Sequence, residues 1–197
     1  MISMLLVAAA LADTQPTGID AISPFEFRPG PALVSDAMVG LGGASSLGLS
    51  AALVVQERDW QVGVGTVSAM AVTVTFTEFT KQLVERRRPF TWDTGRSSFR
   101  ADGYCASPPS ADDCKSFFSG HTSMAAVSSF SAVEALRSSG QLQSHIGFAY
   151  GVAALYTVGV GSFRVAAGKH YPTDVVLGAL VGSVVGIVVP RLVSAVH

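Results

Sequence analysis

Long apolar stretches alternate with short polar segments along the chain. Uncharged residues fill 37–56, 60–77, 146–163 and 175–190, and a further run over 116–133 is interrupted by His121. Most of these runs approach the roughly 20 residues that a helix needs to cross a bilayer. Their many Gly, Ala and Ser residues suit close packing of helices in lipid. The pattern predicts five transmembrane helices, over residues 32–55, 60–86, 118–138, 146–163 and 172–189.

The composition supports a membrane protein. Hydrophobic residues make up 49% of the chain and charged residues only 14%, against roughly one quarter charged in a soluble domain. The fold class expected is therefore all-α, a membrane-embedded bundle forming a single domain over residues 32–197. A soluble all-helical protein is the alternative, since several runs are rich in serine and the last is short. The net charge of -1 gives no sign of a nucleic-acid-binding face, and no obligate protein partner is indicated.

The segments outside the bundle are of two kinds. Residues 1–12 are apolar and end Ala-Leu-Ala before Asp13, which resembles the end of a secretory signal, although a basic start is missing and the stretch is short. It is either a truncated signal or an apolar terminus. Residues 13–31 are rich in Pro, Gly and Asp, and we interpret them as a flexible polar arm.

Both cysteines lie in the long polar loop over residues 90–115. Cys105 and Cys114 are separated by Pro-Pro and Asp-Asp pairs, which fits a small loop closed by a disulfide in an oxidising compartment. Such a bond would stabilise the fold by about 2 to 3 kcal/mol. Two free thiols are the alternative.

Helix order brings the polar residues together. Alternating helices place the end of the second, the start of the third, the end of the fourth and the start of the fifth on one side of the membrane. The cysteine loop lies on that side, so we expect it to be the exported face, in a bacterium the periplasmic face of the inner membrane. Seven of the Arg and Lys residues would then lie outside, contrary to the positive-inside tendency, as an anion-binding site there would require.

The end of the fourth helix and the start of the fifth are joined by a compact polar stretch, residues 164–174. It holds Arg164, Lys169, His170 and Asp174 between two apolar segments, where charge is costly unless it has a task. Pro172 suits the first turn of a helix, which places Asp174 in that turn. A carboxylate there can accept the proton of one imidazole nitrogen and leave the other free as base or nucleophile. A capped helix start with two interfacial cations is the alternative.

Two further clusters fall at the other ends. Lys81 and Arg88 are seven residues apart, which would put both on one side of the second helix; alternatively, Lys81 pairs with Glu78 or Glu85 and the arginines form an interfacial patch. Ser119, Gly120 and His121 open the third helix, where backbone amides form an anion cradle. Together the clusters supply cations, donors and two histidines, the set that phosphoryl transfer requires. The acidic residues are dispersed rather than paired as in a two-metal site, so we expect a reaction without metal or other cofactor, through a phosphohistidine.

These motifs resemble the type 2 phosphatidic acid phosphatase superfamily, which includes bacterial acid phosphatases and vanadium haloperoxidases. The matching pieces are Lys81, six residues, then Arg88-Pro89; Ser119-Gly120-His121; and Arg164, five residues, His170, three residues, Asp174. The resemblance implies that His170 is the nucleophile, Asp174 orients it and His121 protonates the leaving group. It also implies that the phosphate is bound by Lys81, Arg88, Ser119, Gly120 and Arg164.

Two positions depart from the family pattern. Phe118 stands where the family usually has proline, and Phe163 stands where it usually has a serine that donates to phosphate; whether Ser162 compensates is open. The predicted function is hydrolysis of a membrane lipid phosphate or diphosphate, for example phosphatidate, phosphatidylglycerol phosphate or undecaprenyl diphosphate. A vanadate-dependent haloperoxidase and a non-catalytic protein that binds anionic lipid are the alternatives.

Overall fold

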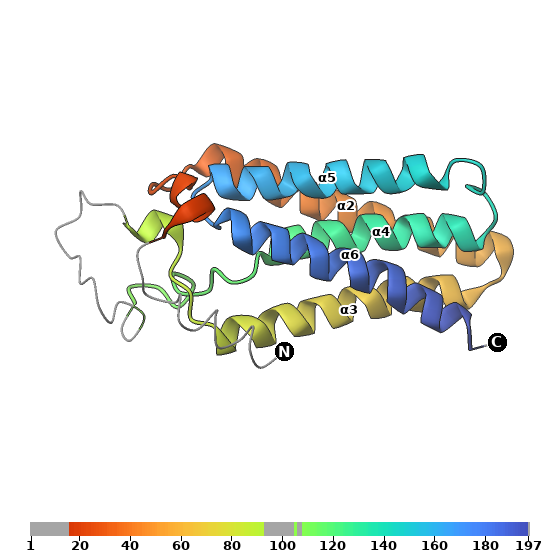
Figure 1. The fold of residues 1–197 in the computed structure, drawn as a ribbon. Coiled ribbons are helices and arrows are strands. Elements are labelled where there is room, and N and C mark those ends of the chain that lie inside the picture. The colour runs from red at the N-terminus through yellow and green to blue at the C-terminus, as the bar shows by residue number, and fades with distance from the viewer. Residues whose placement is uncertain (1–15, 93–104, 106–107, 197) are drawn as a thin grey trace.

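A computed structural model describes residues 16–92, 105 and 108–196. The apolar stretch 1–12 and most of the cysteine loop lie outside these residues. The described elements are five α-helices and two short 3-10 helices: η1 (Gly18–Ile22), α2 (Pro29–Glu57), α3 (Trp60–Leu83), η2 (Pro89–Trp92), α4 (Gly120–Ser138), α5 (Ile146–Ala166) and α6 (Pro172–Ser194). The α-helices run up and down along one long axis, and both 3-10 helices lie at one end (Figure 1). The expected all-α bundle is confirmed.

Four of the helices, α2, α3, α5 and α6, are long and apolar enough to cross a membrane. The remaining helix, α4, carries more polar residues and is surrounded by the other four, since it packs against each of them. Its serine hydroxyls donate to backbone carbonyls of the preceding turn, as Ser128 does to the Met124 carbonyl at 2.8 Å. A helix that faces only protein can therefore be less apolar than its neighbours.

Glycines on α6 bring it against α4. Gly178, Gly182 and Gly186 recur every four residues, and a Cβ at Gly178 would lie 2.6 Å from the carbonyl oxygen of Ser119. A Cβ at Gly182 would lie 2.2 Å from the carbonyl oxygen of Ser123. Small residues at this spacing allow two backbones to approach closely. The contact places the start of α6 beside the start of α4, where the Ser119 amide donates to the Asp174 carbonyl at 3.1 Å.

The second helix ends earlier than predicted. It stops at Leu83 rather than at residue 86, and residues 86–88 instead form backbone hydrogen bonds with residues 113–116. The amide of Arg88 donates to the Asp113 carbonyl at 2.8 Å, and the amide of Ser116 donates to the Arg86 carbonyl at 2.9 Å. Arg88 is therefore outside α3, and the expectation that helical spacing aligns it with Lys81 was wrong.

The last helix continues further than predicted, through Pro190 to Ser194. Proline is tolerated inside a membrane helix when a neighbour packs closely on the break. Here Gly65 of α3 leaves that room, because a Cβ at Gly65 would lie 3.1 Å from the Cα of Pro190.

Candidate active site

His170 lies in the short loop between α5 and α6, and only 2% of its side chain is exposed. Its Nδ1 is 2.8 Å from the carbonyl oxygen of Ser116. A carbonyl only accepts, so Nδ1 carries the proton and Nε2 presents a lone pair. Arg88 Nη1 lies 3.3 Å from that Nε2, which places a cation directly beside a nucleophilic nitrogen.

The environment of His170 keeps the ring neutral. Burial, together with the positive charges of Arg88 and Arg164, holds the pKa of His170 well below its usual value. Both causes disfavour the imidazolium. A neutral imidazole is the form that can attack phosphorus.

The spacing suggested that Asp174 accepts a hydrogen bond directly from His170, and the structure does not show this bond. Its Oδ2 is 3.8 Å from Nδ1 of His170, while the Ser116 carbonyl is a full ångström closer. The carboxylate instead accepts from the hydroxyl of Ser116 at 2.5 Å and from the amide of Tyr171 at 3.0 Å. Asp174 therefore fixes Ser116, whose carbonyl in turn orients the imidazole.

Behind Asp174 lies a buried ion pair that the sequence did not indicate. Arg86 Nη1 donates to Asp174, and Arg86 Nη2 donates to Asp20 of η1 at 2.7 Å. Asp20 also accepts from the Thr173 amide at 3.1 Å. Burial alone would lower the pKa of Arg86, but Asp174 and Asp20 outweigh it and raise that pKa. The segment before α2 is thus tied to the start of α6.

A second group of side chains surrounds Arg164, near the end of α5. Its Nη1 donates to Asp36 of α2 at 2.8 Å and to the hydroxyl of Ser35 at 3.2 Å. Its Nε is buried and has no hydrogen-bond partner among the described residues. Asp36 Oδ1 also lies 2.8 Å from Nε2 of His121. Asp36 and Ser35 were absent from the predicted set, because nothing in the pattern of α2 marks them as neighbours of Arg164.

The third group lies where α3 ends and α4 begins. A Cβ at Gly120 would lie 3.2 Å from Lys81 Nζ, so the ammonium stands at the first turn of α4. Lys81 also pairs with Glu78 at 2.8 Å. The ion pair that the sequence offered as an alternative is therefore present, and Lys81 still lies beside Gly120. Ser119 is fully buried and caps α4, accepting from the Thr122 amide at 3.4 Å and from the Thr122 hydroxyl at 2.9 Å.

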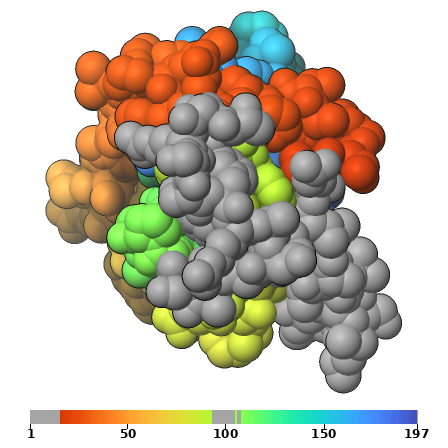
Figure 2. Space-filling model, turned by 90° about the vertical axis from the view of Figure 1, so that its left-hand side faces the viewer, coloured from red at the N-terminus to blue at the C-terminus, as the bar shows by residue number. Residues whose placement is uncertain are grey.

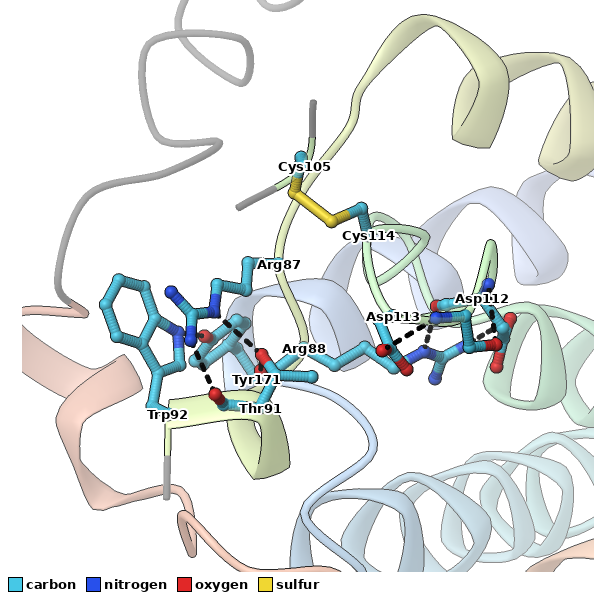
Figure 3. Close-up of a disulfide and its surroundings, with 10 residues drawn as sticks. Arg87, Arg88, Thr91, Trp92, Cys105, Asp112, Asp113, Cys114 and Tyr171 are labelled. Carbon is cyan, nitrogen blue, oxygen red and sulfur yellow. Dashed lines mark hydrogen bonds and ion pairs between the residues drawn. A yellow bond between two sulfur atoms is a disulfide. The ribbon is translucent and has the colours of Figure 1, made fainter. Parts of the chain in front are cut away.

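Arg88 is held by the loop that the disulfide closes. Cys105 and Cys114 are bonded, with a sulfur–sulfur distance of 2.03 Å, as predicted. Two residues before Cys114, Asp112 accepts two hydrogen bonds from Arg88 (Figure 3). Arg88 Nη2 donates to the Asp112 carboxylate at 2.8 Å, and Arg88 Nε donates to the Asp112 carbonyl at 2.8 Å. Burial would raise the pKa of Asp112, but the charge and hydrogen bond of Arg88 hold it below its usual value. The disulfide loop therefore positions one of the phosphate-binding candidates.

The predicted site residues thus gather at one end of the bundle. Arg164 and Lys81 act electrostatically on both histidines, and Arg88, Ser116 and Lys169 lie directly around His170. Figure 2 views the molecule from that end, with the start of α2 above and residues 108–118 and the end of α3 at the side and below. Among the described residues no group of three or more His, Cys, Asp or Glu is placed to hold a metal ion.

The two departures from the family pattern have different settings. Phe118 is buried, with 2% exposed, and Phe163 is 38% exposed. Ser162 does not replace the missing serine, because its hydroxyl donates to the Val158 carbonyl at 2.8 Å on an exposed part of α5. Ser35 instead places a hydroxyl on Arg164 from a different helix.

The fold and this cluster define a membrane-spanning helical bundle with a cluster of cations and two histidines at its helix ends. The PAP2 superfamily matches residues 63–197, and the chain belongs to that family. It is also similar in fold to the structure described as the first transmembrane PAP2 type phosphatidylglycerolphosphate phosphatase from Bacillus subtilis. The TM-score is 0.64 and the identity 22%, over 99% of this chain and 92% of that one. None of the curated proteins compared with the chain matches it. The chain is an integral membrane protein.

Proposed function

We propose that the protein is a lipid phosphate phosphatase that works through a covalent phosphohistidine. The observation that carries the proposal is the state of His170. Its Nδ1 proton is held by the Ser116 carbonyl at 2.8 Å, and its free Nε2 faces Arg88 at 3.3 Å. A neutral, oriented imidazole beside fixed cations is what in-line attack on a phosphate ester requires.

The first step is attack on phosphorus. Nε2 of His170 forms the P–N bond while the bond between phosphorus and the leaving oxygen breaks. Arg88, Lys81 and Arg164 neutralise charge on the three equatorial oxygens, and the leaving oxygen takes a proton from His121. Preorganised donors of this kind usually supply the largest share of catalysis.

The second step regenerates the enzyme. A water molecule attacks the phosphohistidine on the side that the alcohol has left, and His121 accepts the proton of that water. The P–N bond breaks, inorganic phosphate is released and the electron pair returns to Nε2 of His170. The Ser116 carbonyl holds the Nδ1 proton throughout.

An apolar cavity favours a lipid as the leaving group. A space of about 490 Å³ lies between α2, α4 and α5, and its walls include Gly42, Leu49, Val133 and Phe148. Gly42 is six residues along α2 from Asp36, or about 9 Å at the rise of an α-helix. A lipid whose phosphate binds Arg164 would therefore extend its acyl chain toward this space.

The disulfide supports placing the site on the exported side. The bond closes the loop that holds Arg88, and disulfides persist in oxidising compartments. We therefore place the active site on the periplasmic face of a bacterial inner membrane. Phosphatidate, phosphatidylglycerol phosphate and undecaprenyl diphosphate are the substrate candidates.

The test is phosphate release from phosphatidate by the purified protein in detergent and in vesicles. His170→Ala is expected to abolish release while the protein still folds and accumulates. His145→Ala is the matched control, because His145 is exposed at the opposite end of the bundle, and it is expected to retain full activity. Brief incubation of the native protein with radiolabelled substrate is expected to give an acid-labile, base-stable phosphoenzyme. Undiminished release by His170→Ala would refute the mechanism.

A further inference from the structure

Asp36 occupies an unusual place in the site. Its Oδ1 lies 2.8 Å from Nε2 of His121 and 2.8 Å from Nη1 of Arg164. The side chain of Asp36 is 54% exposed, whereas that of Arg164 is 6% exposed. The carboxylate therefore lies on the solvent-exposed side of the site, in front of the nitrogen donors of His121 and Arg164.

The partners of Asp36 show which side of the reacting phosphorus it occupies. In the proposed reaction His170 attacks from one side and the leaving oxygen departs in line on the other. His121 gives its proton to that oxygen, so the groups that contact His121 lie beside the leaving group. Asp36 contacts His121 directly, while the contacts of His170 are Ser116, Arg88 and Asp174.

The charge at this position distinguishes two kinds of lipid phosphate. When a phosphomonoester such as phosphatidate is cleaved, the leaving group is an uncharged alcohol whose hydroxyl can hydrogen-bond to a carboxylate. When a lipid diphosphate is cleaved, the leaving group carries the inner phosphate, and its negative charge would lie beside Asp36. Two like charges about 5 Å apart repel enough to change a rate constant by between about fourfold and a few hundredfold, depending on solvent screening.

Nearby cations do not remove this repulsion. In the proposed reaction Arg164 and Lys81 bind oxygens of the phosphate that is transferred, and each already contacts a carboxylate, Asp36 for Arg164 and Glu78 for Lys81. An inner phosphate would have to displace Asp36 from both His121 and Arg164, or lie against it without a counter-charge. Either arrangement costs free energy, because the first gives up both contacts of Asp36 and the second places two like charges together.

We infer that Asp36 is a specificity-determining residue that makes the enzyme prefer lipid phosphomonoesters over lipid diphosphates. The inference rests on the proposed function. It adds a residue of α2, outside the three sequence motifs, to the substrate-binding surface. It also narrows the substrate class to monoesters such as phosphatidate or phosphatidylglycerol phosphate.

The experiment compares two substrates that share one diacylglycerol, phosphatidate and diacylglycerol diphosphate, in the same vesicles. The quantity measured is the ratio of kcat/KM for the diphosphate to that for the monophosphate. Asp36→Asn keeps the shape of the side chain and removes its charge, and it is expected to raise this ratio about tenfold. Asp36→Glu keeps the charge and is expected to leave the ratio near that of the native protein. Glu57→Gln removes an exposed carboxylate at the far end of the same helix and is expected to leave it unchanged.

The outcomes separate this inference from the proposed function. A ratio that Asp36→Asn leaves unchanged or lowers would overturn the inference, including the case in which both substrates slow equally because Asp36 only orients His121. A native protein that already favours the diphosphate would also overturn it. Failure of the proposed function would look different, since neither substrate would release phosphate or His170→Ala would release it normally.

Discussion

Both ends of the bundle bury charged groups, but the partners of those groups are buried to different degrees. At the far end Glu134 of α4 is 1% exposed and is surrounded by Tyr150, Arg137 and Arg191, which we call the Glu134 cluster. Glu134 Oε2 accepts from Arg137 at 2.6 Å, and Oε1 accepts from Arg191 Nη2 at 2.7 Å and from the Tyr150 hydroxyl. The carboxylate is saturated by side chains from three helices.

At the site end, two of the buried cations have carboxylate partners that are exposed. Arg164 and Arg88 have side chains only 6% and 4% exposed, while their carboxylate partners Asp36 and Asp112 are 54% and 58% exposed. An exposed carboxylate contributes little to stability and leaves one side of the ion pair open to solvent and to a ligand. The Glu134 cluster therefore stabilises the bundle, whereas the site end keeps cations available for a phosphate.

The largest expected effect comes from removing one arginine at each end. Arg88→Ala is expected to lower kcat/KM for phosphatidate by about 10²- to 10³-fold, as the loss of one preorganised donor usually does. Arg191→Ala is expected to leave activity per folded molecule unchanged. Phosphate release normalised to folded protein measures both. Equal losses in the two variants would contradict the contrast between the ends.

The complementary change is Glu134→Gln. It is expected to lower the free energy of unfolding by about 2 kcal/mol, because the charge-assisted hydrogen bonds of one buried carboxylate are weakened. Activity of the folded fraction should not change. Thermal unfolding in detergent, followed by an activity assay below the transition, measures both quantities. A variant as stable as the native protein would show that the Glu134 cluster is not stabilising.

The cavity between the two ends gives a smaller effect. Ser45 is exposed and lines the cavity, so Ser45→Trp would fill it without disturbing the core. It is expected to lower kcat/KM about tenfold for a long-chain phosphatidate, the effect of losing contact with two or so methylene groups, and to spare a short-chain water-soluble one. Ala44→Trp is the matched control, since Ala44 is the exposed neighbour outside the cavity lining. Equal effects on both chain lengths would place the acyl chain elsewhere.

The last effect is on stability against pH. The pKa of His170 is held well below its usual value by burial and by Arg88 and Arg164, so below about pH 6.5 the unfolded chain binds a proton there that the folded protein does not. The contribution of this group to stability is complete above that pH and falls by about 1.4 kcal/mol for each pH unit below it. Unfolding of the native protein should therefore become easier on acidification than that of His170→Asn. If the unfolding free energies of the two proteins change in parallel from pH 7 to 5, His170 binds its proton as readily in the folded protein as in the unfolded chain.

Much of the site could be predicted from the sequence because its motifs fall at helix ends. Three motifs at the ends of alternating apolar runs must meet on one side of a bundle, and His170, His121, Lys81 and Arg164 do so. The cysteines lie nine residues apart in one polar loop, so their pairing was also predictable. Arg88 was placed in the site for the wrong reason, since it reaches His170 from the segment that follows α3 rather than from α3 itself.

Other parts depended on contacts between distant segments. Asp20, Asp36 and Ser35 lie far from the motifs along the chain, and only the packing of η1 and α2 against α5 and α6 brings them to Arg86 and Arg164. The partner of His170 was decided in the same way. The spacing to Asp174 allowed a direct bond, but the backbone hydrogen bonds between residues 113–116 and 86–88 bring the Ser116 carbonyl closer.

The sequence by itself determined the helices, the side on which the polar residues gather and the chemistry that they can perform, because hydrophobic length and helix order follow from local composition. The tertiary structure decided which groups touch. Hydrogen bonds and charge pairing act over a few ångströms, and those distances are set by how glycine-lined helices such as α6 pack on α4 rather than by any pattern along one segment.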